Sequence, residues 1–134
     1  MPSKVFQVRT SKHTDFVNIT DLVNSFVRES GISDGLVVIY VPHTTAAVFV
    51  NEGADPDVAR DIAYKLDRLI DWNDPNYKHI EGNSAAHIKS ALIGNSRVIP
   101  LINGKLALGT WEAIFLAEFD GPRTRKVIVQ ILRD

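Results

Sequence analysis

Three histidines stand where side chains can reach a ligand. His43 follows the apolar run 36–41 and Pro42, while His79 and His87 lie eight positions apart, on either side of an expected helix start. Neutral imidazoles bind divalent metals such as zinc, and they transfer protons near neutral pH. Each histidine could equally be hydrogen-bonded in a turn or exposed to solvent, and the spacing alone does not decide between these roles.

Polar neighbours of the histidines extend the range of chemistry. Thr44 and Thr45 carry hydroxyls that can donate to phosphate oxygens, although threonine also begins strands well. Glu81 and Asn83 could be metal ligands, partners of an imidazole, or helix-capping residues. Glu52 follows the apolar run 45–50, where a carboxylate can bind, catalyse or simply be solvated.

Two arginines follow a turn signal near the end of the chain. Arg123 and Arg125 come directly after Asp120-Gly121-Pro122 and would project from one side of an extended segment. Such a guanidinium pair suits a phosphate, a carboxylate or a nucleotide. The alternative is an internal Glu–Arg or Asp–Arg ion pair, because Glu118 shares an apolar strand face and needs a partner.

Trp111 lies in a long β-type run, 105–119, which Gly109 interrupts. Glycine within a strand favours a bulge or bend that changes the direction of its neighbours. We therefore expect the Trp111 ring to pack into the core or the wall of a pocket, where it would stack on an aromatic part of a ligand.

The elements that position these groups follow from the hydrophobic periodicity. Capping signals at Thr20 or Asp21, at Asp55-Pro56 and at Asn83 or Ser84 predict three helices. Runs of β type predict about seven strands, at 4–10, 15–19, 36–41, 45–50, 97–102, 105–119 and 126–132. The unbroken apolar runs 36–41 and 45–50 are typical of strands buried on both faces.

This pattern predicts one α+β domain over residues 1–134. The strands gather toward the C-terminal end instead of alternating with helices, which argues against a doubly wound parallel sheet. Asn103-Gly104 between two apolar runs predicts a hairpin.

Composition limits the classes of partner. The chain has 134 residues, a net charge of −1 and no cysteine, so it offers neither long-range attraction for nucleic acid nor a thiolate metal site. The start lacks the apolar core of a signal peptide, and no apolar run is long enough to span a bilayer. We expect a cytoplasmic protein that binds neither nucleic acid nor membrane.

Three segments together resemble the YjbQ-like family, also called the secondary thiamine-phosphate synthase enzyme family. They are PHTTAAVFVNE, HIEGNSAAHIKSALIG and GKLALGTWEAIFLAEFDGPRTR. The resemblance covers the chain from about Phe6 to its end, and its most specific part is the Leu-Gly-Thr-Trp run followed by the arginine turn. Glu112 departs from the pattern, in which glutamine is expected after the tryptophan.

The resemblance implies a pseudo-barrel of folded mixed or antiparallel sheet with helices packed on it, assembled as a homotrimer. It also implies a weak thiamine-phosphate synthase activity, which joins an aminopyrimidine diphosphate to a phosphorylated thiazole and releases diphosphate. Such chemistry needs cations or arginines where charge develops on the leaving group.

Two hypotheses follow. In the first, the chain is an enzyme for a small phosphorylated metabolite, with a divalent metal ion, zinc or magnesium, as its cofactor. Its expected residues are His43, Glu52 and His87 for catalysis, His43, His79 and His87 for metal, and Thr44, Thr45, Asn83, Trp111, Arg123 and Arg125 for the substrate. In the second, the same groups form a non-catalytic, trimeric module that binds a metabolite or an ion. A purely structural protein is a third and weaker hypothesis.

Overall fold

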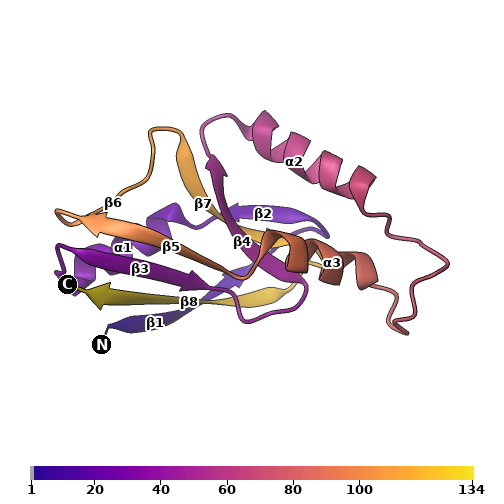
Figure 1. Ribbon diagram of the computed structural model, residues 1–134, viewed down its shortest axis with the longest axis horizontal. Helices are drawn as coiled ribbons and strands as arrows, with labels where there is room; N and C mark the ends of the chain where they lie inside the picture. Colours follow the sequence, from indigo (N-terminus) through magenta and orange to yellow (C-terminus); the bar gives the residue numbers. More distant parts are fainter. Residues whose placement is uncertain (1) are drawn as a thin grey trace.

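Two antiparallel sheets and three helices make up the computed structural model, which describes residues 2–134 (Figure 1). One sheet has five strands in the order β1-β8-β3-β5-β6, and the other has three in the order β2-β7-β4. The elements are β1 (Ser3–Arg9), β2 (Asp15–Asn18), α1 (Thr20–Ser30), β3 (Gly35–Tyr40), β4 (Ala46–Glu52), α2 (Pro56–Leu69), α3 (Ser84–Ile93), β5 (Ser96–Ile102), β6 (Lys105–Leu106), β7 (Glu112–Glu118) and β8 (Thr124–Arg133). The predicted α+β class is confirmed.

The run 105–119 forms two strands instead of the single one expected. β6 pairs with β5 across a tight turn in which Asn103 and Gly104 both have positive φ, of 51° and 76°. This geometry confirms the predicted hairpin. The chain then leaves the first sheet, and β7 becomes the central strand of the second sheet. Glu112 Oε1 accepts a hydrogen bond from the Gly109 amide over 2.8 Å in the connecting turn.

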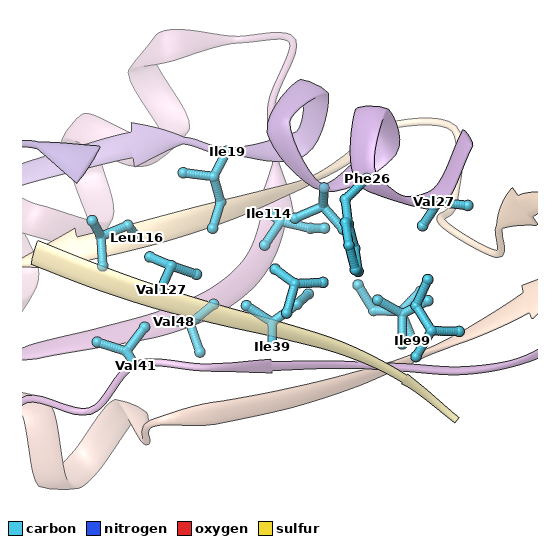
Figure 2. Packing of buried hydrophobic residues seen from close by; sticks show 14 of the residues in the cluster. Ile19, Phe26, Val27, Ile39, Val41, Val48, Ile99, Ile114, Leu116 and Val127 are labelled. Atoms are coloured by element: carbon cyan, nitrogen blue, oxygen red, sulfur yellow. The ribbon is translucent and has the colours of Figure 1, made fainter. Parts of the chain in front are cut away.

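The three-stranded sheet is buried on both faces. Toward the larger sheet, Val48 of β4 and Ile114 and Leu116 of β7 join the main core with α1 (Figure 2). On the opposite face, Phe49 and Phe115 stack with their ring centroids 5.2 Å apart, beneath side chains of α2 and α3. The expectation that the run 45–50 is buried on both faces is therefore confirmed, apart from its last residue, Val50, which is only partly buried.

The same expectation is wrong for β3. Val37 and Ile39 are completely buried, but Leu36 and Tyr40 are 44% and 46% exposed on the outer face of the five-stranded sheet. The core side of this sheet faces α1 and the second sheet, whereas the apolar side chains of α2 and α3 pack on the far face of the second sheet. Within residues 2–134, no helix covers this outer face of the larger sheet.

The three helices begin close to the predicted positions, but among the residues described only α2 has the predicted side-chain cap. The residue before α1 is Ile19, and neither α1 nor α3 has a capping hydrogen bond from a side chain. The Asp55 carboxylate accepts a hydrogen bond from the Asp57 amide at the start of α2, with Pro56 in the first turn. Gly31 ends α1 in the left-handed conformation with φ of 67°. Residues 70–83, between α2 and α3, extend beyond the rest of the fold in Figure 1. None of the helices described is long and apolar enough to cross a membrane.

Candidate functional site

A cleft of about 420 Å³ lies where the segment after β3, the start of α3 and the start of β8 meet. It brings together all of the site residues expected from the sequence except Glu52 and Trp111. The lining residues are Pro42, His43, Thr44, Thr45, His79, Glu81, Asn83, His87, Arg123 and Arg125. Side chains from three separate parts of the sequence thus converge on one polar surface.

Glu52 and Trp111 lie elsewhere in the chain. Glu52 Oε2 accepts hydrogen bonds from the Ala54 and Asp55 amides, at 2.8 and 3.2 Å, and so stabilises the turn before α2. Trp111 is 65% exposed, because it belongs to the turn between β6 and β7 and not to a strand. The expected packing of its ring into the core is wrong for the single chain, but Trp111 does line a pocket, separate from the cleft, together with Asn18 and Asp21.

Arg125 is held by a buried carboxylate. Glu118 Oε1 accepts hydrogen bonds of 2.8 Å from Arg125 Nε and from the Thr10 hydroxyl, and Oε2 accepts a short one from Arg125 Nη2. Arg125 Nη2 also donates to the Thr45 hydroxyl over 2.8 Å. The alternative of an internal ion pair is therefore confirmed, for Arg125 with Glu118 and for Arg123 with Asp120, although both arginines also line the cleft.

Arg123 is oriented by the turn that precedes it. Its Nε donates to the Asp120 carbonyl over 2.7 Å, and its Nη2 donates to Asp120 Oδ2 over 3.0 Å. About half of the Arg123 side chain is exposed, so the guanidinium can still donate into the cleft. The turn packs closely on the buried network: a Cβ added to Gly121 would lie 2.4 Å from the Lys12 carbonyl and 2.8 Å from Glu118 Cγ.

Both carboxylates of this network are ionised at neutral pH. Burial alone would raise the pKa of Glu118, but hydrogen bonds from Arg125, the Asp120 amide and Thr10 bring that pKa below its ordinary value. Burial opposes ionisation of Asp120 too, and hydrogen bonds from Asn83 and Arg123 again lower the pKa. Each cleft arginine therefore has a permanently charged partner.

His43 is neutral and has one nitrogen occupied. Its Nε2 accepts a hydrogen bond from the Lys126 amide over 2.8 Å, which places the ring proton on Nδ1. Burial lowers the pKa of His43 below 6.5, and the charges of Arg125 and Lys126 lower it further, against an opposing effect of Glu118. In this state His43 can donate a hydrogen bond from Nδ1–H, whereas the lone pair of Nε2 already accepts one from the Lys126 amide.

His79 and His87 form a pair at the other side of the cleft. Their rings meet edge to face, with centroids 5.2 Å apart. Residues 2–134 contain no group of three or more histidine, cysteine or acidic side chains placed to hold a metal ion. The expected centre of three imidazoles is thus not formed in the single chain, since His43 Nε2 is bonded to Lys126.

Most residues of the cleft are predicted from the sequence, but the residues that support them are not. The sequence indicates that Glu118 needs a partner, without placing it in the site. Thr10 carries no signal, because a threonine at the end of a strand is ordinary. Asp120 is predicted only as part of a turn.

The cleft is rich in groups that suit an oxyanion. Guanidinium N–H groups, an imidazole N–H and threonine hydroxyls all donate, and charge-assisted hydrogen bonds of this kind are the strong ones. The ion pairs hold the arginines in position before any ligand arrives, which lowers the entropic cost of binding.

Residues 4–134 match the family model described as UPF0047 protein YjbQ-like. The UPF0047 protein MJ1081 of Methanocaldococcus jannaschii is 51% identical over 96% of this chain and 93% of its own length. The UPF0047 protein YugU of Bacillus subtilis is 43% identical over 96% and 98%. Two crystal structures have closely similar folds. The first is an uncharacterized conserved protein of the YjbQ/UPF0047 family from Clostridium acetobutylicum, with a TM-score of 0.94 and 52% identity over 96% of this chain and 99% of that one. The second is the hypothetical protein APE1520 from Aeropyrum pernix, with a TM-score of 0.95 and 40% identity over 100% of both chains.

Proposed function

The chain belongs to the UPF0047, YjbQ-like family, and we propose that it is an enzyme that binds a small phosphorylated metabolite in the cleft. The observation that carries this proposal is the convergence of Arg123, Arg125 and His43 on one polar surface. A thiamine-phosphate synthase-like condensation is the activity we assign to it, as a secondary reaction.

The chemistry of that reaction matches the groups present. When an aminopyrimidine diphosphate loses diphosphate, negative charge builds up on the leaving group. Donors that are already in position stabilise such charge best. In our proposal Arg123 and Arg125 bind the leaving diphosphate, while Thr44 adds a hydroxyl donor. His87, whose ring faces His79, is the residue we assign to proton transfer.

The structure limits which histidines can be proposed as metal ligands. Because His43 Nε2 is bonded to Lys126, the residues as placed do not fit three-imidazole coordination of zinc or magnesium. His79 and His87 are the remaining candidates for ligands of such an ion. The arginines therefore carry the electrostatic role in the proposed reaction.

We also propose a homotrimer, joined through the outer face of the five-stranded sheet. Exposed apolar side chains gather there: Leu36 lies opposite Leu132 in register, and Val98 lies opposite the half-buried Val38. Exposed apolar surface of this kind marks interaction sites more often than it stays solvated.

A non-catalytic binding module is the second candidate, and one observation favours it. The proton acceptors nearest the arginines already accept hydrogen bonds from the protein. His43 Nε2 accepts one from the Lys126 amide, and the Glu118 oxygens accept from Arg125, Thr10 and the Asp120 amide. A site that binds an anion tightly but has few free bases recognises a ligand better than it transforms one.

Calorimetry with inorganic phosphate, followed by a product assay, separates these functions. Wild-type protein should bind phosphate, and Arg123→Ala should weaken binding about tenfold or more, as loss of a charge-assisted hydrogen bond does. Arg60→Ala is the control, because Arg60 is an exposed arginine that pairs with Asp57 on α2. Thiamine phosphate formed from the two precursors, and lost in His87→Ala, supports the enzyme. Binding without product supports the module, and binding that Arg123→Ala leaves unchanged contradicts both.

A further inference from the structure

The cleft offers hydrogen-bond donors but little surface for the organic part of a ligand. Except for Pro42, each of the residues that line it is polar or charged. A phosphorylated metabolite also carries a carbon skeleton, which binds best where it leaves water for an apolar surface. The organic part of such a ligand therefore needs a second surface next to the cleft.

A second pocket with such a surface adjoins the cleft. It has a volume of about 430 Å³ and is mostly apolar, and Tyr77, His79, His87 and Ile88 are among the residues that line it. We call it the ring pocket. His79 and His87 line the cleft as well, so the two cavities meet at this pair of imidazoles.

The side chains of the ring pocket are accessible to a ligand. His79 is exposed, Ile88 is 42% exposed, and Tyr77 and His87 are half-buried. The Tyr77 hydroxyl donates a hydrogen bond to the Asp71 carbonyl over 2.7 Å, which fixes the end of the side chain. The Tyr77 ring is thus held in place before a ligand arrives, and this lowers the entropic cost of a contact with it.

The residue types of the ring pocket favour a flat ring over an aliphatic chain. Three of its lining side chains are rings, and the His79 and His87 rings already meet edge to face with centroids 5.2 Å apart. Rings gain from edge-to-face and offset contacts with one another beyond the area that they bury. Ile88 adds an aliphatic surface on which the face of a ring can lie.

We propose that the ring pocket binds an aromatic ring of the ligand whose phosphate group lies in the cleft, and that Tyr77 and Ile88 determine this specificity. The link between phosphate and ring is short, because the same two histidines line both cavities. A ligand bound in this way passes beside His87, the residue to which we assign proton transfer. This inference rests on the proposed function, because it assumes that the cleft binds phosphate.

Calorimetric titration of the wild-type protein with benzyl phosphate and with methyl phosphate, at pH 8 and with EDTA present, tests the ring pocket. The two esters differ only by a phenyl ring, and both are fully ionised at this pH. Benzyl phosphate should bind about ten times more tightly, from burial of the ring and its contacts with other rings. Cyclohexylmethyl phosphate, which has a saturated ring, should bind about three times more weakly than benzyl phosphate.

Ile88→Ser tests the aliphatic surface of the pocket. It should lower the preference for benzyl phosphate over methyl phosphate about threefold, because apolar contact area is lost. The affinity for inorganic phosphate should change less than about twofold, since Ile88 does not line the cleft. Leu92→Ser is the control: Leu92 is 64% exposed on the same helix and does not line the pocket, so the wild-type preference should remain.

A second pair of variants tests the Tyr77 ring. Tyr77→Ser removes the ring and should reduce the preference for benzyl phosphate to about twofold or less. Tyr77→Phe keeps the ring and loses only the hydrogen bond to the Asp71 carbonyl, so it should keep most of the preference. Loss of the preference in both variants would show that the hydroxyl, and not the ring, is needed, which contradicts the proposal.

The failures are distinguishable. If the wild-type protein binds neither phosphate nor the esters, the proposed function is wrong. If it binds methyl and benzyl phosphate equally, the cleft is an anion site and the ring pocket is wrong. Equal binding of benzyl and cyclohexylmethyl phosphate overturns the aromatic specificity, and a preference that persists in Ile88→Ser or Tyr77→Ser overturns the role of that residue. If Arg123→Ala weakens binding of methyl phosphate but not of benzyl phosphate, the ring and the phosphate do not bind together, and the two-part site is wrong.

Discussion

Glu118 and Arg125 form an ion pair that is almost completely enclosed by protein, with Arg125 Nε 2.8 Å from Glu118 Oε1. The carboxylate also accepts from the Asp120 amide over 3.0 Å, and Asp120 in turn holds Arg123. One buried carboxylate thus organises both arginines of the cleft. In the proposed function, Glu118 is therefore a positioning residue, because it would act on a ligand only through its partners.

Removing this carboxylate should destabilise the fold. Glu118→Ala leaves the Arg125 guanidinium buried without its partner, and such a change costs about 3–5 kcal/mol. Urea denaturation followed by circular dichroism measures the free energy of unfolding. Asp57→Asn, which breaks the exposed Asp57–Arg60 pair, is the control and should cost less than about 1 kcal/mol. Similar costs for the two variants would show that the buried pair adds little.

Most strands and helices are predicted correctly from the sequence, because their hydrophobic periodicity and capping residues are local features. The caps at Asp55 and Gly31 and the Asn103-Gly104 hairpin are local features that depend on a few neighbouring residues. The run 105–119 was not divided correctly, since only long-range pairing assigns β6 and β7 to different sheets. Burial of β3 was overestimated for a similar reason: an apolar run does not reveal which of its faces is covered.

The sequence predicts which residue types form the candidate site but not which hydrogen bonds they make. His43, His79, His87 and the arginine turn were recognised from polar groups at element ends. No spacing rule predicts that the Lys126 amide occupies His43 Nε2, because 83 positions separate the two residues. For the same reason, the sequence does not predict that the Thr10 hydroxyl bonds to Glu118, which lies 108 positions away.

Acidification should destabilise the protein partly through His43. Its pKa is lower in the folded chain than the ordinary 6.5, so below pH 6.5 the unfolded chain binds a proton that the folded chain does not. Stability associated with neutral His43 is therefore complete above pH 6.5 and is lost as the pH falls toward the lowered pKa. The free energy of unfolding should drop more between pH 8 and pH 5 in the wild type than in His43→Gln. Equal drops in the two proteins would contradict this account.

Assembly should depend on the outer face of the five-stranded sheet. Val98 is 56% exposed there, opposite Val38, and a lysine at this position would place a charge within an apolar contact. Light scattering at micromolar concentration should show a trimer for the wild type and a monomer for Val98→Lys. Tyr64→Lys is the control: Tyr64 is 60% exposed on α2, so this variant should remain trimeric. A monomeric wild type would refute the proposed assembly.

Zinc binding should depend on His79 and His87 and not on His43. The two rings are adjacent, whereas His43 would have to give up its bond to the Lys126 amide before Nε2 could coordinate a metal. In a zinc titration followed by calorimetry, His87→Ala should therefore weaken binding at least tenfold, while His43→Gln should change it less than about threefold, because a metal site tolerates loss of a residue that is not a ligand. His13→Ala, which alters an imidazole that lies near Asp120, is the control for nonspecific loss. If His43→Gln weakens zinc binding as much as His87→Ala does, the three imidazoles converge on the ion when it binds, and the bond to Lys126 is broken in the metal-bound protein.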